Sequence, residues 1–203
     1  MVVTPRQVAA ASPESVSRST TLATFLTLLC ARPAAEVVDL GSVVGGNITF
    51  LGDRIGCKIH VEDLYADLDR HARQDKLDQV AAFLTSRFSH LNESIDAILC
   101  WDVFDYLDQA AAYVLAEESM RMLRPGGILL AFFGGGGSSD LRYTRYCIVD
   151  ESHLRHTLHA AACARRLVLQ NRDILNLFGK LAVLDSILLK SGVRELLFQK
   201  PTN

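Results

Sequence analysis

The sequence has little excess of either charge and no long apolar run. Its 203 residues carry 21 Lys and Arg against 23 Asp and Glu, which gives a formal net charge of −2 and a predicted pI of about 6.3. Proteins that bind duplex nucleic acid usually show a basic excess, so this class of partner is disfavoured. No apolar stretch reaches the roughly 20 residues of a membrane-spanning helix, so no membrane segment is expected.

Paired cysteines are also lacking. The five cysteines are odd in number, widely spread, and include no C-x-x-C pair. This pattern favours reduced thiols in a cytoplasmic protein. A competing signal is Arg18 followed by the apolar residues 22–31, which together have the form of a short signal-peptide core. Because Leu22, Leu26 and Leu29 recur at helical spacing, this stretch is better interpreted as an amphipathic helix that packs on a sheet.

What the sequence does contain is a complete βαβ pattern over residues 36–64. An apolar run ends at Asp39, a glycine-bearing turn and an amphipathic segment follow, and a second apolar run ends at Glu62. Such units bind nucleotides, because glycine lets the backbone approach the ligand and a carboxylate closing the second strand accepts hydrogen bonds from a ribose diol. Glu62 lies close to the roughly 20-residue offset that these units use.

The glycines of this turn do not form the dinucleotide fingerprint G-x-G-x-x-G, since residues 41–46 are Gly-Ser-Val-Val-Gly-Gly. Residues 39–45, Asp-Leu-Gly-Ser-Val-Val-Gly, instead resemble the first motif of class I S-adenosylmethionine-dependent methyltransferases, an acid-x-Gly-x-Gly-x-Gly loop. Val43 stands in place of the middle glycine. A β-branched residue does not easily take a positive φ, so the loop is expected to be either re-routed or tighter than in the family.

Two further motifs follow in the family's order. Residues 94–107 resemble its fourth strand and the loop after it, and residues 123–133, which begin Leu-Arg-Pro-Gly-Gly, resemble the turn into its fifth strand. Residues 193–199 resemble its antiparallel last strand. The resemblance implies an α/β, three-layer Rossmann-like methyltransferase fold with a mostly parallel sheet and an antiparallel last strand. We expect one such domain over residues 18–203 and a flexible N-terminal arm over residues 1–17.

The family's third strand and the acid after it are missing. In the family this acid hydrogen-bonds the adenine amino group, but residues 83–90, Phe-Leu-Thr-Ser-Arg-Phe-Ser-His, contain no carboxylate. Ser86 or a backbone carbonyl is the available substitute. The loss of one charged hydrogen bond typically costs about 1.5–3 kcal/mol of binding free energy.

The resemblance also assigns a cofactor, S-adenosylmethionine, and the residues that hold it. The loop over residues 41–46 would face the amino-acid end of the cofactor, and Glu62 would bind the ribose hydroxyls, with Asp63 as the alternative. Trp101 would pack near the adenine or the methionine chain, although a core position is nearly as plausible for this residue type. The cofactor-binding residues implied in this way are Asp39, Gly41, Ser42, Gly45, Glu62, Asp63, Trp101 and Asp102.

Methyl transfer from a sulfonium requires mainly that the acceptor be positioned and, for some acceptors, that it lose a proton. The best-placed polar groups are Asp102, Asp105 and Tyr106, for which capping or packing of the next helix is the alternative role. Arg142 and Arg145 are either an anion clamp or solvated loop residues. The acceptor is expected to enter between the loops over residues 101–106 and 134–140, under partial cover of the N-terminal arm.

Apolar spacing in the remaining chain predicts further elements. His153, His156 and His159 fall in an expected helix capped by Asp150, where they would spread around the axis, so no metal site is expected. The four glycines from Gly134 precede no Lys-Ser/Thr pair and do not form a P-loop. The spacing predicts helices over residues 47–55, 77–84, 111–122, 150–161 and 174–188, and a short strand over residues 166–170.

Two functions of different classes follow from these observations. The first is a cytoplasmic S-adenosylmethionine-dependent methyltransferase, whose unidentified acceptor is a small molecule or a protein rather than nucleic acid. The second is a non-catalytic relative that keeps the fold as a binding or scaffolding module, with a homodimer as one arrangement. Val43 and the missing adenine acid favour the second function, whereas Asp39, Glu62 and Asp102 favour the first.

Overall fold

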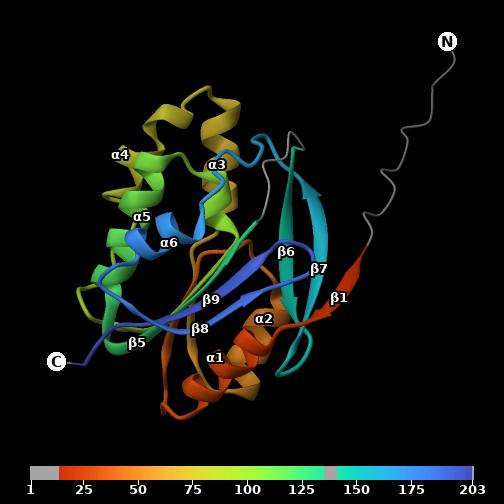
Figure 1. Ribbon diagram of the computed structural model, residues 1–203, viewed down its shortest axis with the longest axis vertical. Helices are drawn as coiled ribbons and strands as arrows, with labels where there is room; N and C mark the ends of the chain where they lie inside the picture. The colour runs from red at the N-terminus through yellow and green to blue at the C-terminus, as the bar shows by residue number, and fades with distance from the viewer. Residues whose placement is uncertain (1–13, 135–140, 203) are drawn as a thin grey trace, which may run out of the picture.

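A six-stranded sheet forms the centre of the computed structural model, which describes residues 14–134 and 141–202 (Figure 1). The strand order is β3-β2-β4-β5-β9-β8. The first four strands in this order are parallel, whereas β9 runs antiparallel to both of its neighbours. The strands are β2 (Glu36–Asp39), β3 (Lys58–Val61), β4 (Ile95–Trp101), β5 (Leu123–Phe133), β8 (Ala182–Leu188) and β9 (Arg194–Gln199). The expected mostly parallel sheet with an antiparallel last strand is confirmed.

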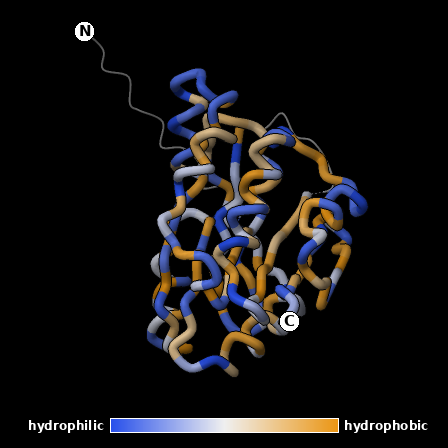
Figure 2. Tube along the Cα trace, turned by 90° about the vertical axis from the view of Figure 1, so that its left-hand side faces the viewer, coloured by the Kyte–Doolittle hydropathy of each residue, from blue (hydrophilic) through white to orange (hydrophobic). Residues whose placement is uncertain are grey.

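Helices cover both faces of this sheet. Alternate residues of β4 face opposite sides, so that Ile98 and Cys100 belong to one core cluster while Leu99 and Trp101 belong to the other. One face packs against α3 (Leu64–Arg73), α4 (Val80–Leu84), α5 (Gln109–Met122) and α6 (Asn171–Leu177). The other face packs against α1 (Thr20–Cys30) and against Phe50 and Leu51, which follow α2 (Gly45–Thr49). Apolar residues line the inner segments, whereas the outer turns are mostly hydrophilic (Figure 2).

A second, smaller sheet packs beside the first and is called the outer sheet below. Its strands are antiparallel, in the order β1-β7-β6, with bounds β1 (Ser15–Arg18), β7 (His153–Ala160) and β6 (Arg142–Ile148). Three of the four residues of β1 fall within the segment expected to be an arm. In Figure 1 the outer sheet stands to the side of α2. Arg145 of β6 reaches Oγ of Ser42, in the loop that follows β2.

Several elements predicted in the C-terminal third are wrong. Residues 153–160 form β7 and not a helix, because they pair along their whole length with β6. No strand forms over residues 166–170. The helix expected over residues 174–188 divides into α6 and the strand β8, which pairs with β9.

The first crossover helix is shorter than expected. After α2 the chain continues as a π-helical turn, η1 (Phe50–Arg54), and the chain leaves it at Gly56, whose φ of +84° suits glycine. Ile48, which regular helical spacing over residues 47–55 would bury together with Leu51 and Ile55, is 41% exposed, and Phe50 is buried. The π-helical turn shifts the buried side of the segment, which helical spacing alone does not reveal.

Between α3 and β4 the described chain forms the 3₁₀ turn η2 (Leu77–Gln79) and α4, and no strand lies where the family's third strand was sought. The sheet therefore ends at β3. Across the described ranges, no helix combines the length and the apolar character needed to cross a membrane.

Candidate functional site

The carboxyl ends of β2, β3 and β4 bring the predicted acids to one edge of the sheet. The amide of Glu62 donates to the carbonyl of Asp39 at 2.8 Å, and the amide of Leu40 donates to the carbonyl of Leu99 at 2.9 Å. The three strands therefore end side by side, which is where parallel sheets bind ligands. Asp39, Glu62 and Trp101 all lie at this edge.

Asp39 is buried and holds the glycine-bearing loop. Its Oδ1 accepts hydrogen bonds from the amide of Gly41 at 2.9 Å and from Nε1 of Trp101 at 2.7 Å. Burial raises the pKa of Asp39 to about 6, and these hydrogen bonds offset part of that rise. Val43 is 54% exposed and has no positive φ, so the loop accommodates valine by turning its side chain toward solvent.

The indole of Trp101 covers the inner side of this loop. A Cβ placed on Gly41 would lie 2.7 Å from Nε1 of Trp101 and 3.0 Å from Oδ1 of Asp39, which leaves no space between the indole and the loop. Gly45, in contrast, has no atom within 4 Å of such a Cβ. The loop is thus closed by the protein itself at Gly41 and open at Gly45.

Glu62 is fully engaged by two basic side chains. Arg87 donates from Nη1 to Oε2 of Glu62 at 2.6 Å, and His90 Nε2 lies 2.7 Å from Oε1. Arg87 also donates to Oδ2 of Asp67 at 2.7 Å. Both basic residues come from residues 83–90, the segment in which the family's adenine acid was expected. This segment thus carries basic side chains where the family has an acid, and these side chains pair with Glu62.

Asp63, the alternative ribose ligand, has a local structural role. It takes the left-handed conformation with φ of +41° and caps α3, because its side chain accepts a hydrogen bond from the amide of Ala66 at 3.1 Å. A carboxylate bound to the first turn of a helix has less freedom to bind a ligand. Both candidate ribose ligands are thus engaged within the chain, Asp63 by the first turn of α3 and Glu62 by Arg87 and His90.

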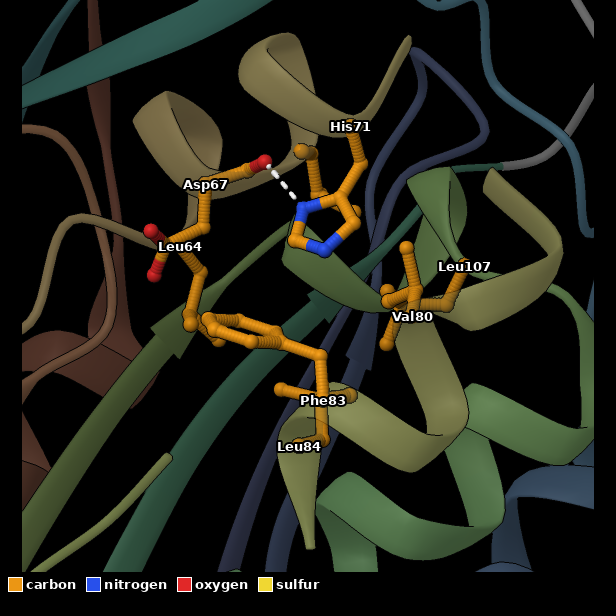
Figure 3. Close-up of a pocket in the computed structure, with 8 residues that line it drawn as sticks. Leu64, Asp67, His71, Val80, Phe83, Leu84 and Leu107 are labelled. Atoms are coloured by element: carbon orange, nitrogen blue, oxygen red, sulfur yellow. Dashed lines mark hydrogen bonds between the residues drawn. The ribbon is translucent and has the colours of Figure 1, made fainter. Parts of the chain in front are cut away.

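An apolar hollow lies between α3 and α4, lined by Leu64, the residue that follows Asp63 (Figure 3). Phe83 and Val80 face Leu64 across it, and the ring of His71 turns toward the carbonyl of Asp67, 2.8 Å from Nδ1. Its volume of about 10 Å³ is that of a single water site. As it stands, the hollow is too small for an adenine ring.

The segment after β4 contributes a buried cluster of two carboxylates and one guanidinium. Arg165 donates from Nη2 to Oδ2 of Asp102 at 2.8 Å, and its Nη1 lies 3.3 Å from Oδ2 of Asp105. Tyr65 from α3 donates to the other oxygen of Asp102. One cation between two buried acids leaves one negative charge unbalanced.

This imbalance falls on Asp105, which lies in η3 (Val103–Tyr106). Burial and the neighbouring Asp102 raise its pKa to about 7, against the opposing effects of Arg165 and of the Gly134 amide. That amide donates to Oδ2 of Asp105 at 2.8 Å, whereas Oδ1 is buried and has no hydrogen-bond partner among the described residues. Burial also raises the pKa of Asp102, and Arg165 opposes the rise.

The remaining predicted residues are distributed around this cluster. The hydroxyl of Tyr106 donates to the carbonyl of Arg142 at 3.0 Å, and Arg145 reaches Oγ of Ser42 at 3.3 Å, so both arginines belong to β6 and not to a loop. The three histidines lie on β7, and no metal-binding group of His, Cys, Asp or Glu occurs among the described residues. Residues 135–140 of the predicted acceptor entrance lie outside the described residues.

A cavity of about 270 Å³ opens at the carboxyl end of β5. Gly134, whose amide binds Asp105, lines it together with Asn171 and Arg194. Gly134 is thus the link between this cavity and the acid cluster, because Asp102, Asp105 and Arg165 do not line the cavity.

Sequence reasoning found the acids of this site and missed their partners. Arg87, His90 and Arg165 pair with them, and Tyr146 of β6 stacks on Trp101. The one available signal was the basic character of residues 83–90. Arg165 lies 63 positions from Asp102, and no sequence signal indicates that the two residues pair.

The site has the residue types that a nucleoside-containing cofactor requires, but not the open arrangement. Asp39 holds the loop as expected, and Gly45 leaves space beside it. The carboxylate of Glu62 is bound to Arg87 and His90, and the surface of Gly41 is covered by the indole. The arrangement described here thus does not accommodate the cofactor without movement of these side chains.

Comparisons with known proteins agree with the fold. Residues 38–131 match the family model described as a methyltransferase domain. The structure is similar to that of 1,6-didemethyltoxoflavin-N1-methyltransferase from Burkholderia thailandensis, solved with S-adenosylhomocysteine bound (TM-score 0.54, 14% identity, 89% of this chain and 77% of that chain). It is also similar to a TehB-like methyltransferase from Corynebacterium glutamicum (TM-score 0.53, 16% identity, 89% and 87%). A search of curated protein sequences gave no match.

Proposed function

We propose that this chain, whose residues 38–131 match a methyltransferase domain, is a class I S-adenosylmethionine-dependent methyltransferase. It binds S-adenosylmethionine and transfers the methyl group to a small-molecule or protein acceptor. The observation that carries the proposal is the placement of Asp39 and Glu62. Two acids close adjacent parallel strands on either side of a glycine-bearing loop, at the edge where such sheets bind nucleosides.

On the cofactor side, we assign the loop from Gly41 to Gly45 to the amino-acid end and Glu62 to the ribose hydroxyls. Asp39 acts through the loop, since its Oδ1 is already bound to the amide of Gly41. The bound cofactor would supply an activated methyl group with a good leaving group. The chain itself has to bind, orient and exclude water.

On the acceptor side, we assign Asp105 as the group that receives a proton from an amine or hydroxyl acceptor. A carboxyl with a pKa of about 7 is matched to proton transfer near neutral pH. Its Oδ1 has no hydrogen-bond partner among the described residues, and Gly134, whose amide binds Asp105, lines a 270 Å³ cavity with space for a small acceptor group. Asp102 and Arg165 position Asp105 and set its charge.

A non-catalytic role is the second candidate, and one observation favours it. Glu62, which would bind the ribose, has both of its oxygens paired with side chains of the same chain. A protein that no longer binds the cofactor has no use for a free carboxylate there, and internal pairing stabilises it instead.

Isothermal titration with S-adenosylhomocysteine separates the two candidates. Glu62→Gln should weaken binding by about one to two decades, since a lost charged hydrogen bond costs about 1.5–3 kcal/mol. Glu36→Gln is the matched control, because Glu36 opens β2 at the opposite end of the same unit and also pairs with a basic residue, Lys58. Equal affinities of the two variants would remove Glu62 from the site.

A further inference from the structure

Trp101 is held in a conformation that is unfavourable for a bulky residue. Its φ of +48° lies in the left-handed region, where a bulky non-glycine residue is strained. Such strain persists only where the surrounding contacts impose it. Trp101 is also only 2% exposed, so that the strain is located in the interior, at the carboxyl end of the central strand β4.

Three contacts hold the indole in place. Nε1 donates to Asp39 at 2.7 Å, the ring lies parallel to that of Tyr146 with centroids 5.2 Å apart, and Phe132 packs against its edge. The fourth side of the indole is the surface of Gly41. The indole is therefore enclosed between the loop that follows β2 and the strand β6 of the outer sheet.

The outer sheet is fastened to the same loop. Asn47 at the start of α2 donates from Nδ2 to the carbonyl of Tyr146 at 3.0 Å and accepts from the amide of Ile148 at 2.7 Å. Arg145 reaches Oγ of Ser42. These bonds keep Tyr146 above the indole and close the loop from outside.

We propose that the indole of Trp101 occupies the space over Gly41 that the amino-acid end of S-adenosylmethionine requires, so that the indole and the cofactor exclude each other. The proposal rests on the proposed function, which places that end of the cofactor at the glycine-bearing loop. No ligand atom fits between Gly41 and the indole as they stand. Cofactor binding therefore requires the Trp101 side chain to rotate away from Gly41. This movement breaks its hydrogen bond to Asp39 and its stacking on Tyr146.

The wild-type protein can test this proposal without substitution, because Trp101 is the only tryptophan in the sequence. Its fluorescence is followed during titration with S-adenosylhomocysteine, and binding is measured in parallel by calorimetry. The expected result is a shift of the emission to longer wavelength and stronger quenching by acrylamide at saturation. Calorimetric binding with unchanged emission and unchanged quenching would overturn the proposal.

Substitution gives a second test. Trp101→Gly removes the indole and suits the positive φ, so it should bind S-adenosylhomocysteine at least about tenfold more tightly than the wild type, the lower end of what one hydrogen bond to a charged group contributes. Trp101→Phe keeps apolar packing but lacks the donor to Asp39, and it should tighten binding by a smaller factor. It serves as the test if the glycine variant does not fold. Phe198→Leu, in a buried position away from Gly41, is the matched control and should not change affinity.

The outcomes separate this proposal from the function on which it rests. Binding by Trp101→Gly but not by the wild type supports exclusion in its strongest form. Equal affinity of the wild type and both Trp101 variants, within about threefold, overturns exclusion and leaves the methyltransferase function standing. Absence of binding by all of these folded proteins overturns the proposed function, and exclusion with it.

Discussion

Arg87 binds Glu62 twice, from Nη1 to the side-chain Oε2 at 2.6 Å and from Nη2 to the backbone carbonyl at 2.7 Å. The same side chain that would bind a ribose is therefore locked to the chain's own guanidinium. Arg87 is only partly exposed, so the pair is less screened by salt than a surface ion pair.

Arg87→Gln should free Glu62 and tighten S-adenosylhomocysteine binding by about threefold or more, because the ribose no longer competes with a charged partner. Calorimetric titration checks this. Arg54→Gln is the control, since Arg54 donates to Oε1 of Glu151 at 2.6 Å, the same distance as between Arg87 and Glu62. Weaker binding by Arg87→Gln would show instead that Arg87 orients Glu62 for the ligand.

Asp105→Asn should alter the pH dependence of stability. The folded pKa of Asp105, about 7, lies above the ordinary aspartate value of 3.8, so in the wild type this group's stabilising contribution is complete below about pH 4 and is lost as the pH rises through about 7. The loss has a slope of up to about 1.4 kcal/mol per pH unit. The side-chain amide of the variant does not titrate. In urea unfolding, the free energy of unfolding of the variant should therefore rise relative to that of the wild type as the pH increases across this window. A constant difference would contradict the raised pKa.

Gly41→Ala should destabilise the fold by about 1–3 kcal/mol, because its Cβ would overlap the indole of Trp101 and press on Asp39. The displaced indole should also emit at longer wavelength. Gly45→Ala introduces the same methyl group where no atom lies within 4 Å and should change stability by no more than about 0.5 kcal/mol. Thermal unfolding of the two variants makes the comparison. Similar losses in both would mean that the loop is not closed at Gly41.

Asn47→Ala should detach the outer sheet from α2. Both bonds of this buried amide are lost, which leaves the carbonyl of Tyr146 and the amide of Ile148 unsatisfied at a cost of about 2–4 kcal/mol. Hydrogen exchange at the Ile148 amide should accelerate together with the drop in unfolding free energy. Asn176→Ala, on the exposed side of α6, provides the control. Unchanged exchange at Ile148 would show that other contacts hold β6.

The central βαβ unit was predictable because its signals are local. The glycine-bearing turn after Asp39 and the acid that closes the next strand are adjacent in the chain, and the parallel pairing of β2 with β3 follows from them. The last strand, β9, was predicted from the resemblance of residues 193–199 to the family's antiparallel last strand. These parts of the fold depend on short-range patterns only.

The outer sheet was not predictable in the same way. Leu154 and Leu158 are spaced as on a helix, yet they lie on β7 because that strand pairs with β6 on one side and with the distant β1 on the other. Pairing between Arg18 and His153 has no local signal. Tertiary pairing therefore overrode a helical pattern, as it did again in β8.

The site shows the same division. Asp102 and Asp105 could be placed at the end of β4 from the sequence, but their shared partner Arg165 lies in an irregular segment after β7. Whether an acid is free or paired decides its chemistry, and this depends on contacts across the fold. The sequence thus indicates which groups face the edge and leaves their charge state open.

The position of β9 has a consequence for how the chain is made. This strand lies between β5 and β8, both of which precede it in the sequence, so neither can complete its hydrogen bonds on that side until β9 has left the ribosome. During synthesis the edge of β5 that faces β9 would therefore stay unpaired, and unpaired strand edges are prone to associate with other nascent chains. Pairing across such long separations is slow, and we expect chaperones that shield unpaired edges to raise the yield of native protein.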